Sequence, residues 1–328
     1  MKILKNRNPA VPGFKAVGLS CGIKAGNVKD LTLIVSDVPA IAVGVFSKNR
    51  IVSPTVIWSR GALAKSKSCC RAIVVNSGNA NSVVGPKGFK DCDLITKKVA
   101  EELSIPQNEV LIAATGVIGV PLPSEKIISA TPQLVAKLGR TQKNWADASE
   151  AIMTTDLVSK SDKTSFNLKG HTITIGGMCK GSGMIHPNMA TMLCFIATDA
   201  PVEQGFLQKA LTEAVDASLN MIDVDGDQST NDTVLVLANG AAGGETIEAD
   251  SASAGAFQEA LRYICTALAK ELVERYGFHS VGGSDSHYVS TIGRCITRFD
   301  RRITCLEELV EELSLGGFDA ALLEDTLA

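Results

Sequence analysis

The sequence predicts a mixed α/β fold in which helices cover layered β-sheets. Apolar segments rich in Val and Ile, bounded by turn residues, are typical of buried strands. Amphipathic segments with a helical period lie between them. No internal repeat or low-complexity linker divides the 328 residues. A chain of this length can form one large domain or two ordinary ones.

The expected strands alternate with turn signals along the first half of the chain. The first is the apolar run LTLIVSDVPAIAVGVFS. The next two each run into a turn rich in Gly, Asn or Thr, and the last alternates apolar and polar residues. In chain order the expected strands cover residues 31–47, 69–82, 109–120 and 167–179.

Four segments are predicted to be helical because their apolar residues recur on one face. In the last of them, Leu261, Ile264, Leu268 and Leu272 form that face, and Gly277 is the expected C-cap. The expected helices cover residues 90–104, 141–153, 202–222 and 257–277.

Composition excludes several classes of function. The formal net charge is −3, so no basic surface for nucleic acid is expected. The chain has no run of about 18 apolar residues, and its N-terminus lacks a long apolar core with a cleavage site. We therefore expect a cytoplasmic protein without a membrane span. The nine cysteines are scattered without a C-x-x-C pair, which favours buried, reduced thiols over a disulfide framework.

Thr191 is the first candidate for chemistry. A threonine hydroxyl becomes a useful nucleophile when cleavage before it frees its own α-amino group as a base. The pKa of an unperturbed α-amine is about 7.7–8.0, so part of it is neutral near pH 7. The small residue Ala190 before Thr191 suits self-cleavage. On the dipeptide alone, a threonine at the start of a buried strand is the competing interpretation.

The surrounding stretch, CKGSGMIHPNMATML at residues 179–193, strongly resembles the self-cleaving ornithine acetyltransferase (glutamate N-acetyltransferase) family of arginine biosynthesis. Further stretches resemble the same family in the same order, and the resemblance runs from about residue 8 to about residue 272. They are NSGNAN (76–81), ATGVIG (114–119), MTTD (153–156) and DVDGDQSTNDT (223–233).

The resemblance implies a layered α-β-β-α sandwich and an acetyl transfer from N-acetylornithine to glutamate, with acetyl-CoA as an additional donor in some members. No cofactor is implied. Cleavage between Ala190 and Thr191 is expected to give an α and a β fragment, which commonly assemble as two of each. A self-processing amidohydrolase or aminopeptidase, which passes the acyl group to water, remains an alternative.

The resemblance also implies residue roles. Thr191 matches the nucleophile that carries the acetyl ester, and Thr115 with Gly116 matches the oxyanion hole. Lys180 matches a lysine that binds the substrate carboxylate. Thr154 is our choice for another substrate contact, although the adjacent Thr155 fits too. Without the resemblance, Thr115-Gly116 reads as a strand-end turn and Lys180 as a surface charge.

The C-terminal part departs from this family. Its late motif of the type Asp-Gly-Glu-Gly-Ala-Thr-Lys is not found, and residues 274–322 instead resemble the C-terminal end of a PHP-type metal-dependent phosphoesterase. We therefore expect an α fragment over 1–190, the start of a β fragment over 191–272 and an unrelated tail over 273–328. A recombined or misassembled reading frame is our hypothesis for the junction, which leaves an inactive truncated protein as a further alternative.

Asp285 and His287 in this tail match the last metal-ligand motif of the phosphoesterase family. The early His-x-His ligands of that family are absent from the sequence. Because two ligands do not make a stable metal site, a vestigial turn is the preferred interpretation, and no metal is expected.

Overall fold

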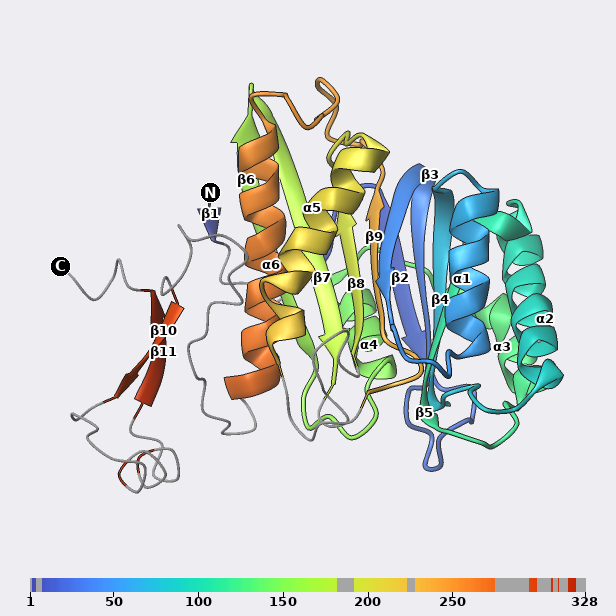
Figure 1. Cartoon of the computed structure of the whole chain (residues 1–328). Helices are drawn as coiled ribbons and strands as arrows, with labels where there is room; N and C mark the ends of the chain where they lie inside the picture. Colours follow the sequence, from blue (N-terminus) through green and yellow to red (C-terminus); the bar gives the residue numbers. More distant parts are fainter. Residues whose placement is uncertain are drawn as a thin grey trace. The chain divides into compact units, whose positions relative to one another are not determined.

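One nine-stranded β-sheet forms the frame of the computed structural model of this chain (Figure 1). Its strands follow the order β1-β6-β7-β8-β9-β3-β4-β5, and β2 pairs separately with β3. The pairs β8–β9 and β4–β5 are parallel, and the others are antiparallel. The strands are β1 (Lys2–Ile3), β2 (Phe14–Leu19), β3 (Leu31–Phe46), β4 (Cys69–Asn79), β5 (Val110–Val117), β6 (Lys160–Leu168), β7 (His171–Lys180), β8 (Leu193–Thr198) and β9 (Thr233–Ala238).

The chain divides into two compact units, Met1–Ala269 and Lys270–Ala328. The second contains the antiparallel pair of β10 (Cys295–Phe299) and β11 (Phe318–Leu322). The structure describes residues 2–3, 8–181, 192–222, 228–274, 295–299 and 318–322, together with Glu308 and Glu312.

The long strand β3 takes part in both halves of the sheet. Its first part pairs with β4 from Leu31 to Val35, and its last part pairs with β9 from Ile41 to Phe46. The pairing with β4 shifts register between Val35 and Ala40. Such an irregularity bends a strand and increases its twist. The sheet therefore folds back on itself, and its two halves lie face to face.

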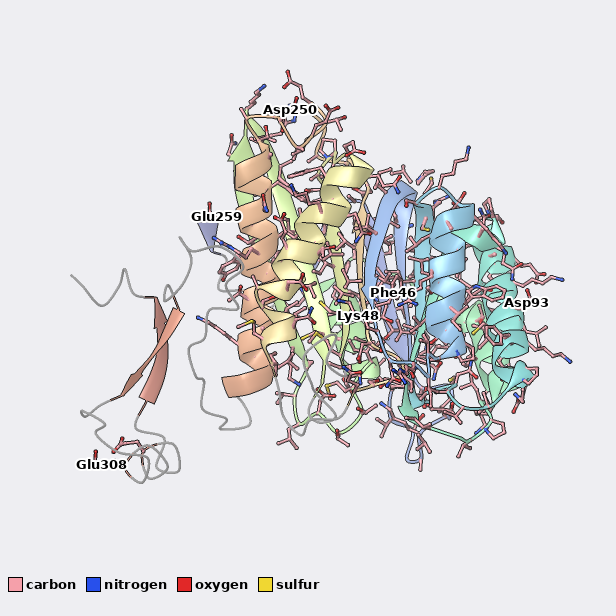
Figure 2. The ribbon with its side chains drawn as sticks, viewed as in Figure 1. Phe46, Lys48, Asp93, Asp250, Glu259 and Glu308 are labelled. Carbon is pink, nitrogen blue, oxygen red and sulfur yellow. The ribbon has the colours of Figure 1, made fainter. Side chains whose placement is uncertain are left out.

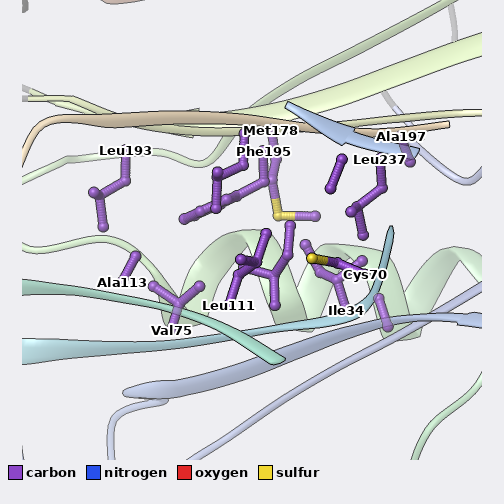
Figure 3. Close-up of a cluster of buried hydrophobic side chains, with 14 of the residues drawn as sticks. Ile34, Cys70, Val75, Leu111, Ala113, Met178, Leu193, Phe195, Ala197 and Leu237 are labelled. Carbon is purple, nitrogen blue, oxygen red and sulfur yellow. The ribbon is translucent and has the colours of Figure 1, made fainter. Parts of the chain in front are cut away.

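The main hydrophobic core fills the space between these halves (Figure 3). Leu193 and Phe195 of β8 approach it from one side, and Val75 of β4 and Leu111 of β5 approach it from the other. All four are at most 2% exposed. Full burial of such a side chain contributes about 1.5–3 kcal/mol, so the facing strands hold each other in place.

Helices cover the outer face of each half of the sheet. On one half, α2 and α3 share a buried hydrophobic cluster with β3 to β5, to which Ile95 of α2 and Leu33 of β3 belong. On the other half, α5 and α6 lie along β7 to β9 (Figure 1), and Ile264 and Leu268 approach Gly177. The predicted α-β-β-α layering is therefore confirmed. The helices are α1 (Pro54–Lys65), α2 (Pro86–Leu103), α3 (Ser124–Ala136), α4 (Gln142–Ala151), α5 (Gln204–Asp216) and α6 (Ala254–Glu274).

Helix α1 forms hydrogen bonds to the edge strand β5 and to the residue that follows β3. The Ser59 hydroxyl donates to the carbonyl of Ile112 at 2.7 Å and accepts from its N–H at 2.8 Å. The Arg60 guanidinium lies 5.3 Å from the ring centroid of Phe46, which is labelled in Figure 2. Arg60 also donates to the carbonyl of Ser47 at 2.8 Å. This helix thus caps an edge that would otherwise expose unpaired backbone groups.

The structure confirms most of the predicted elements and corrects one. The strand predicted over 167–179 is wrong as a single element, because β6 ends at Leu168 and β7 begins at His171. Lys169 and Gly170 between them have φ angles of 47° and 91°, which make the tight turn of a hairpin. The alternation of residues on β7 was interpreted correctly, and the turn was missed.

Two helices were not predicted. Helix α1 begins after the N-cap Ser53 with Pro54 in its first turn, which is a usual start signal. Helix α3 contains Pro132, a residue that normally argues against a helix interior. No helix in the described part of the chain is both long and apolar enough to span a bilayer.

The seven cysteines from Cys21 to Cys265 form no disulfide with one another. Burial raises the pKa of Cys70 and of Cys92 to about 12. These thiols therefore stay protonated and pack as small apolar groups.

Substitution of Gly18 tests the close approach of β2 to α4. A Cβ atom on Gly18 would lie 2.0 Å from the carbonyl oxygen of Asp147. We expect Gly18→Ala to lower the free energy of unfolding by at least about 1–3 kcal/mol, because backbone must move. Gly61→Ala in α1 is the control, since no atom lies near that position, and it should stabilise by about 0.5–1 kcal/mol. Urea unfolding measures both, and equal stability of the two variants would contradict this packing.

Candidate functional site

The first part of the candidate site is the end of β5, where Thr115 and Gly116 lie. Thr115 is 5% exposed and pairs with Ser77 of β4, whereas Gly116 is exposed and pairs with Gly78. Gly116 has φ of 132°, and a Cβ atom there would lie 2.3 Å from the carbonyl carbon of Gly78. Only glycine fits this approach, so the Thr-Gly pair is fixed by the neighbouring strand.

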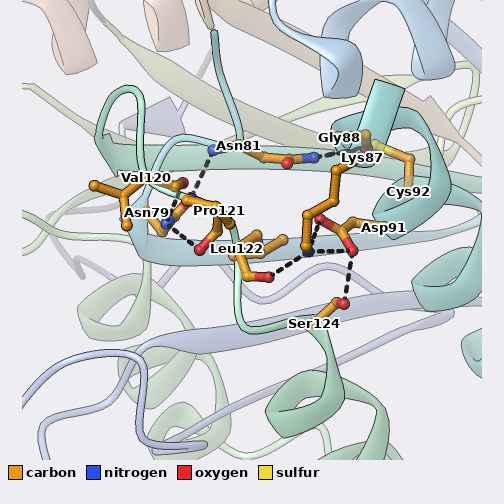
Figure 4. A network of polar contacts seen from close by, with 10 residues as sticks. All are labelled: Asn79, Asn81, Lys87, Gly88, Asp91, Cys92, Val120, Pro121, Leu122 and Ser124. Atoms are coloured by element: carbon orange, nitrogen blue, oxygen red, sulfur yellow. Dashed lines mark hydrogen bonds and ion pairs between the residues drawn. The ribbon is translucent and has the colours of Figure 1, made fainter. Parts of the chain in front are cut away.

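The turn after β4 lies beside this strand end and is held by amide side chains (Figure 4). Asn79 donates to the carbonyl of Val120 at 3.0 Å and accepts from the N–H of Asn81 at 2.8 Å. The Asn81 amide donates in turn to the carbonyl of Gly88 in α2 at 3.0 Å. These bonds use Asn side chains in place of regular backbone pairing, which is their usual role in turns.

Lys180 lies at the end of β7, and its register partner is Leu193 at the start of β8. The lysine therefore lies opposite the strand that begins two residues after Thr191. Its side chain is only 2% exposed. The interpretation of Lys180 as a surface charge is wrong, because the lysine is buried in the sheet.

Burial lowers the pKa of Lys180, although the negative charges of Asp156 and Asp232 act in the opposite direction. A buried ammonium loses the hydration that stabilises its charge. A negative charge placed near Lys180 would therefore strongly favour the charged form of its amine.

A buried ion pair lies next to Lys180. The Asp156 carboxylate accepts from the Lys160 ammonium, and both side chains are fully buried. Asp156 also accepts from the N–H of Gly181 at 2.9 Å and of Thr154 at 3.1 Å. Burial raises the pKa of Asp156, but the bond to Lys160 and these N–H groups lower it to a net value below the usual range.

Asn231 and Asp232, just before β9, form hydrogen bonds to the segments next to Thr115 and Thr191 in the chain. The Asn231 amide donates to the carbonyls of Ala80 and Ala114, at 2.7 and 2.9 Å. The Asp232 carboxylate accepts from the N–H of Met192 at 3.0 Å. Since Ala114 precedes Thr115 and Met192 follows Thr191 in the chain, these two side chains bring the two predicted regions together.

The structure places the remaining predicted residues as follows. Thr154 is exposed, and its backbone N–H, at 3.1 Å from Asp156, is bound to the buried ion pair. Thr191, Ala190, Asp285 and His287 lie outside the described residues. Among the described residues, no cluster of three His, Cys, Asp or Glu side chains is arranged to hold a metal ion.

Several polar residues of this region were not assigned roles from the sequence. Asp156, Asn231 and Asp232 were quoted within motifs, but nothing in the spacing told which polar side chains point inward. Lys160 had no sequence signal at all, because a lysine at the start of an alternating strand is usually on the exposed face.

Removing the acid of the buried pair tests its electrostatic role. Asp156→Asn leaves the Lys160 ammonium without its opposite charge, and we expect a loss of about 3–5 kcal/mol in the free energy of unfolding at pH 7. Because the folded-state pKa of Asp156 is lowered, its contribution is present above the ordinary value of 3.8 and disappears as the pH falls through the lower value.

The difference in stability between wild type and Asp156→Asn should therefore narrow on acidification, and urea unfolding across pH measures it. The exposed pair of Lys169 with Glu245 provides the control. Glu245→Gln should leave stability unchanged within error. A difference for Asp156→Asn that stays constant down to the lowest pH would contradict this account.

Comparison with known protein families identifies two matching segments. The ArgJ family matches residues 15–275, and a PHP-associated family matches residues 267–317. The chain is 46% identical over 270 residues to "Arginine biosynthesis bifunctional protein ArgJ" of Caldanaerobacter subterraneus, covering 82% of this chain and 66% of that protein. It is also 46% identical over 262 residues to the ArgJ protein of Thermotoga neapolitana, covering 80% of this chain and 65% of that protein.

Solved structures agree with this match. The arginine biosynthesis bifunctional protein of Bacillus halodurans is similar with a TM-score of 0.54 and 38% identity, over 58% of this chain and 98% of that one. The ornithine acetyltransferase of Mycobacterium tuberculosis, complexed with ornithine, gives 0.53 and 31%, over 58% of this chain and 99% of that one.

An L-aminopeptidase from Ochrobactrum anthropi, described as a variant of the Ntn hydrolase fold, has a TM-score of 0.55 at 9% identity, over 87% of this chain and 90% of that one. This last likeness concerns the fold alone. The chain spans 66% and 65% of the two curated relatives named above. On the family match over residues 15–275, the chain belongs to the ArgJ family.

Proposed function

We propose that this chain is a self-cleaving acetyltransferase that moves an acetyl group from N-acetylornithine to glutamate through an ester on Thr191. The observation that carries the proposal is the pair of contacts made by Asn231 and Asp232. They hold the residue before Thr115 and the residue after Thr191, respectively. We extend the proposal to acetyl-CoA as a second donor, which the family resemblance implies and which agrees with the description of the relatives as bifunctional.

The reaction needs a base, a nucleophile and a site for the oxyanion. The α-amine of Thr191, freed by cleavage after Ala190, takes the hydroxyl proton as Oγ attacks the acetyl carbonyl. The Thr115 hydroxyl and the Gly116 N–H donate to the oxygen that becomes negative, and loss of one such donor typically costs about 10²–10³ in turnover. The amide C–N bond then breaks, ornithine leaves with the proton, and the acetyl ester remains.

Glutamate completes the cycle when its amine attacks the ester and the Thr191 hydroxyl is restored. Lys180 is the proposed partner of a substrate carboxylate, because a buried lysine gains more from an arriving negative charge than an exposed one. Thr154 is exposed beside the Asp156–Lys160 pair, where its hydroxyl can donate to the substrate.

The lengths of the solved relatives support cleavage near Ala190. The two ArgJ-type chains are covered to 98% and 99% by 58% of the 328 residues, which is about 190 residues. The α fragment predicted to end at Ala190 has the same number of residues as this matched part. We further propose that the two fragments stay together, because β7 and β8 flank the cleavage point and all of β8 pairs with residues 175–180 of β7.

Mass spectrometry of the expressed chain tests cleavage and acetyl transfer together. We expect two fragments, one ending at Ala190 and one beginning at Thr191, and after incubation with N-acetylornithine the second should gain the mass of one acetyl group. Thr191→Ala should stay a single chain without adduct. Thr172→Ala, at an exposed threonine of β7, is the control and should behave as wild type.

The other outcomes separate the alternatives. An uncut wild type that still transfers acetyl groups would refute the terminal amine as the base. Acetate formed at the same rate with and without glutamate would indicate an amidohydrolase. A correct cut without an adduct would indicate that contacts from the missing part of the relatives are needed.

A further inference from the structure

Residues 229–232, which lead into β9, each form hydrogen bonds to other segments although they belong to no helix or strand. The Ser47 hydroxyl donates to the carbonyl of Ser229 at 2.6 Å, and the N–H of Ser53 donates to the carbonyl of Thr230 at 2.9 Å. The N–H of Ser47 donates to the carbonyl of Asp232 at 2.9 Å. These bonds fix the backbone from which the side chains of Asn231 and Asp232 project.

The side chain of Asn231 is fully engaged and has one orientation. Its two amide hydrogens go to the carbonyls of Ala80 and Ala114, and its oxygen accepts from the Thr230 hydroxyl at 2.5 Å. The residue is 5% exposed. A buried amide that satisfies three partners resists rotation, because any other orientation leaves a polar group unpaired. The bond from Asn231 therefore fixes the position of the Ala114 carbonyl, which is part of the peptide group that joins Ala114 to Thr115.

The side chain of Asp232 makes the corresponding contact to β8. Its Oδ1 accepts from the N–H of Met192 at 3.0 Å, while the carbonyl of Met192 accepts from the N–H of Thr233 at 3.1 Å. The N–H and the carbonyl of Met192 are therefore bound by the consecutive residues Asp232 and Thr233. Asp232 is 1% exposed.

We propose that Asn231 and Asp232 are paired positioning residues, which set the distance between the oxyanion donors at Thr115-Gly116 and the nucleophile Thr191. The two side chains are neighbours on one anchored backbone, so neither Ala114 nor Met192 can shift without breaking a buried hydrogen bond. This inference rests on the proposed function, because it concerns the same two reacting groups.

The test compares four alanine variants at the two ends of the same strands. Asn231→Ala and Asp232→Ala remove the proposed contacts. Asn239→Ala and Asp199→Ala are matched controls, because Asn239 follows β9 and Asp199 follows β8 at the opposite end. Like the test residues, both controls are less than 10% exposed. Both accept from a backbone N–H, as Asp232 does, at 3.0 Å from Ala241 for Asn239 and at 2.7 Å from Thr174 for Asp199.

We expect Asn231→Ala and Asp232→Ala to slow self-cleavage after cell-free synthesis, and kcat for transfer, by about 100-fold, since misplacement by 1 Å can cost that much. The KM for N-acetylornithine should change less than about threefold, because the contacts do not bind substrate. The controls should lower the melting temperature by similar amounts while leaving the cleavage rate and kcat near wild type. Equal losses in controls and test variants would assign Asn231 and Asp232 a structural role only.

Asp232→Asn separates positioning from charge. Burial raises the pKa of Asp232 well above 3.8, which favours the neutral carboxyl, and the amide of asparagine keeps an oxygen to accept from Met192. We therefore expect Asp232→Asn to cleave within a few fold of wild type. A rate as low as that of Asp232→Ala would overturn the positioning role in favour of a charge.

Hydrogen exchange distinguishes failure of this inference from failure of the proposed function. If the wild type is neither cut nor active, the proposed function fails, and exchange still tests the contacts. Exchange in the peptides over 114–119 and 192–198 should be faster in Asn231→Ala and Asp232→Ala, respectively, than in the two controls. Unchanged exchange in both peptides would overturn the inference.

Discussion

The fold-back of the sheet at β3 is the constraint on which the rest of this structure depends. A flat sheet in this strand order would separate β5 from β8, because β9, β3 and β4 lie between them. The register shift between Val35 and Ala40 lets β3 serve both halves, which then close on a shared core. The closure brings the end of β5 to the start of β9, where one amide of Asn231 bonds to Ala114 across the layers.

Polar groups are buried where these strand ends meet, and each carries an electrostatic cost. Asp156 offsets the cost for Lys160 by pairing with it, and two backbone N–H groups complete the set of donors to its carboxylate. Lys180 and Asp232 are also buried. Burial lowers the pKa of Lys180 and raises the pKa of Asp232, which favours the neutral form of each side chain. Buried ionisable groups with shifted pKa values are concentrated at functional sites more often than elsewhere.

The described contacts of the candidate site all lie within the segment that matches the ArgJ family. The end of β5, the end of β7 and the start of β9 fall between residues 114 and 233, well inside residues 15–275. The PHP-associated match covers residues 267–317 and so begins within α6. Amphipathic helix sequence is common to many families, which gives a physical reason why two segments can join there without breaking the helix.

The motif residues Thr115, Gly116 and Lys180 were identified from the family resemblance of the sequence. The sequence by itself also determined the layered α/β class, four of the six described α-helices and the strands that correspond to β3, β4, β5 and β7. Periodicity and turn residues carry that information locally, because each element must bury one face. The hairpin turn at Lys169 was not predicted, since the alternating pattern continues through it. Helix α3 was not predicted either, because Pro132 normally indicates the end of a helix.

Tertiary structure alone decided that Lys180 is buried, that Lys160 pairs with Asp156, and that Asn231 and Asp232 reach two different strands. Each of these depends on how the doubled sheet brings distant segments together. The fold-back of β3 decides which distant segments meet, and so which partners these side chains find. No pattern within a short stretch of sequence encodes a contact between segments that lie far apart in the chain.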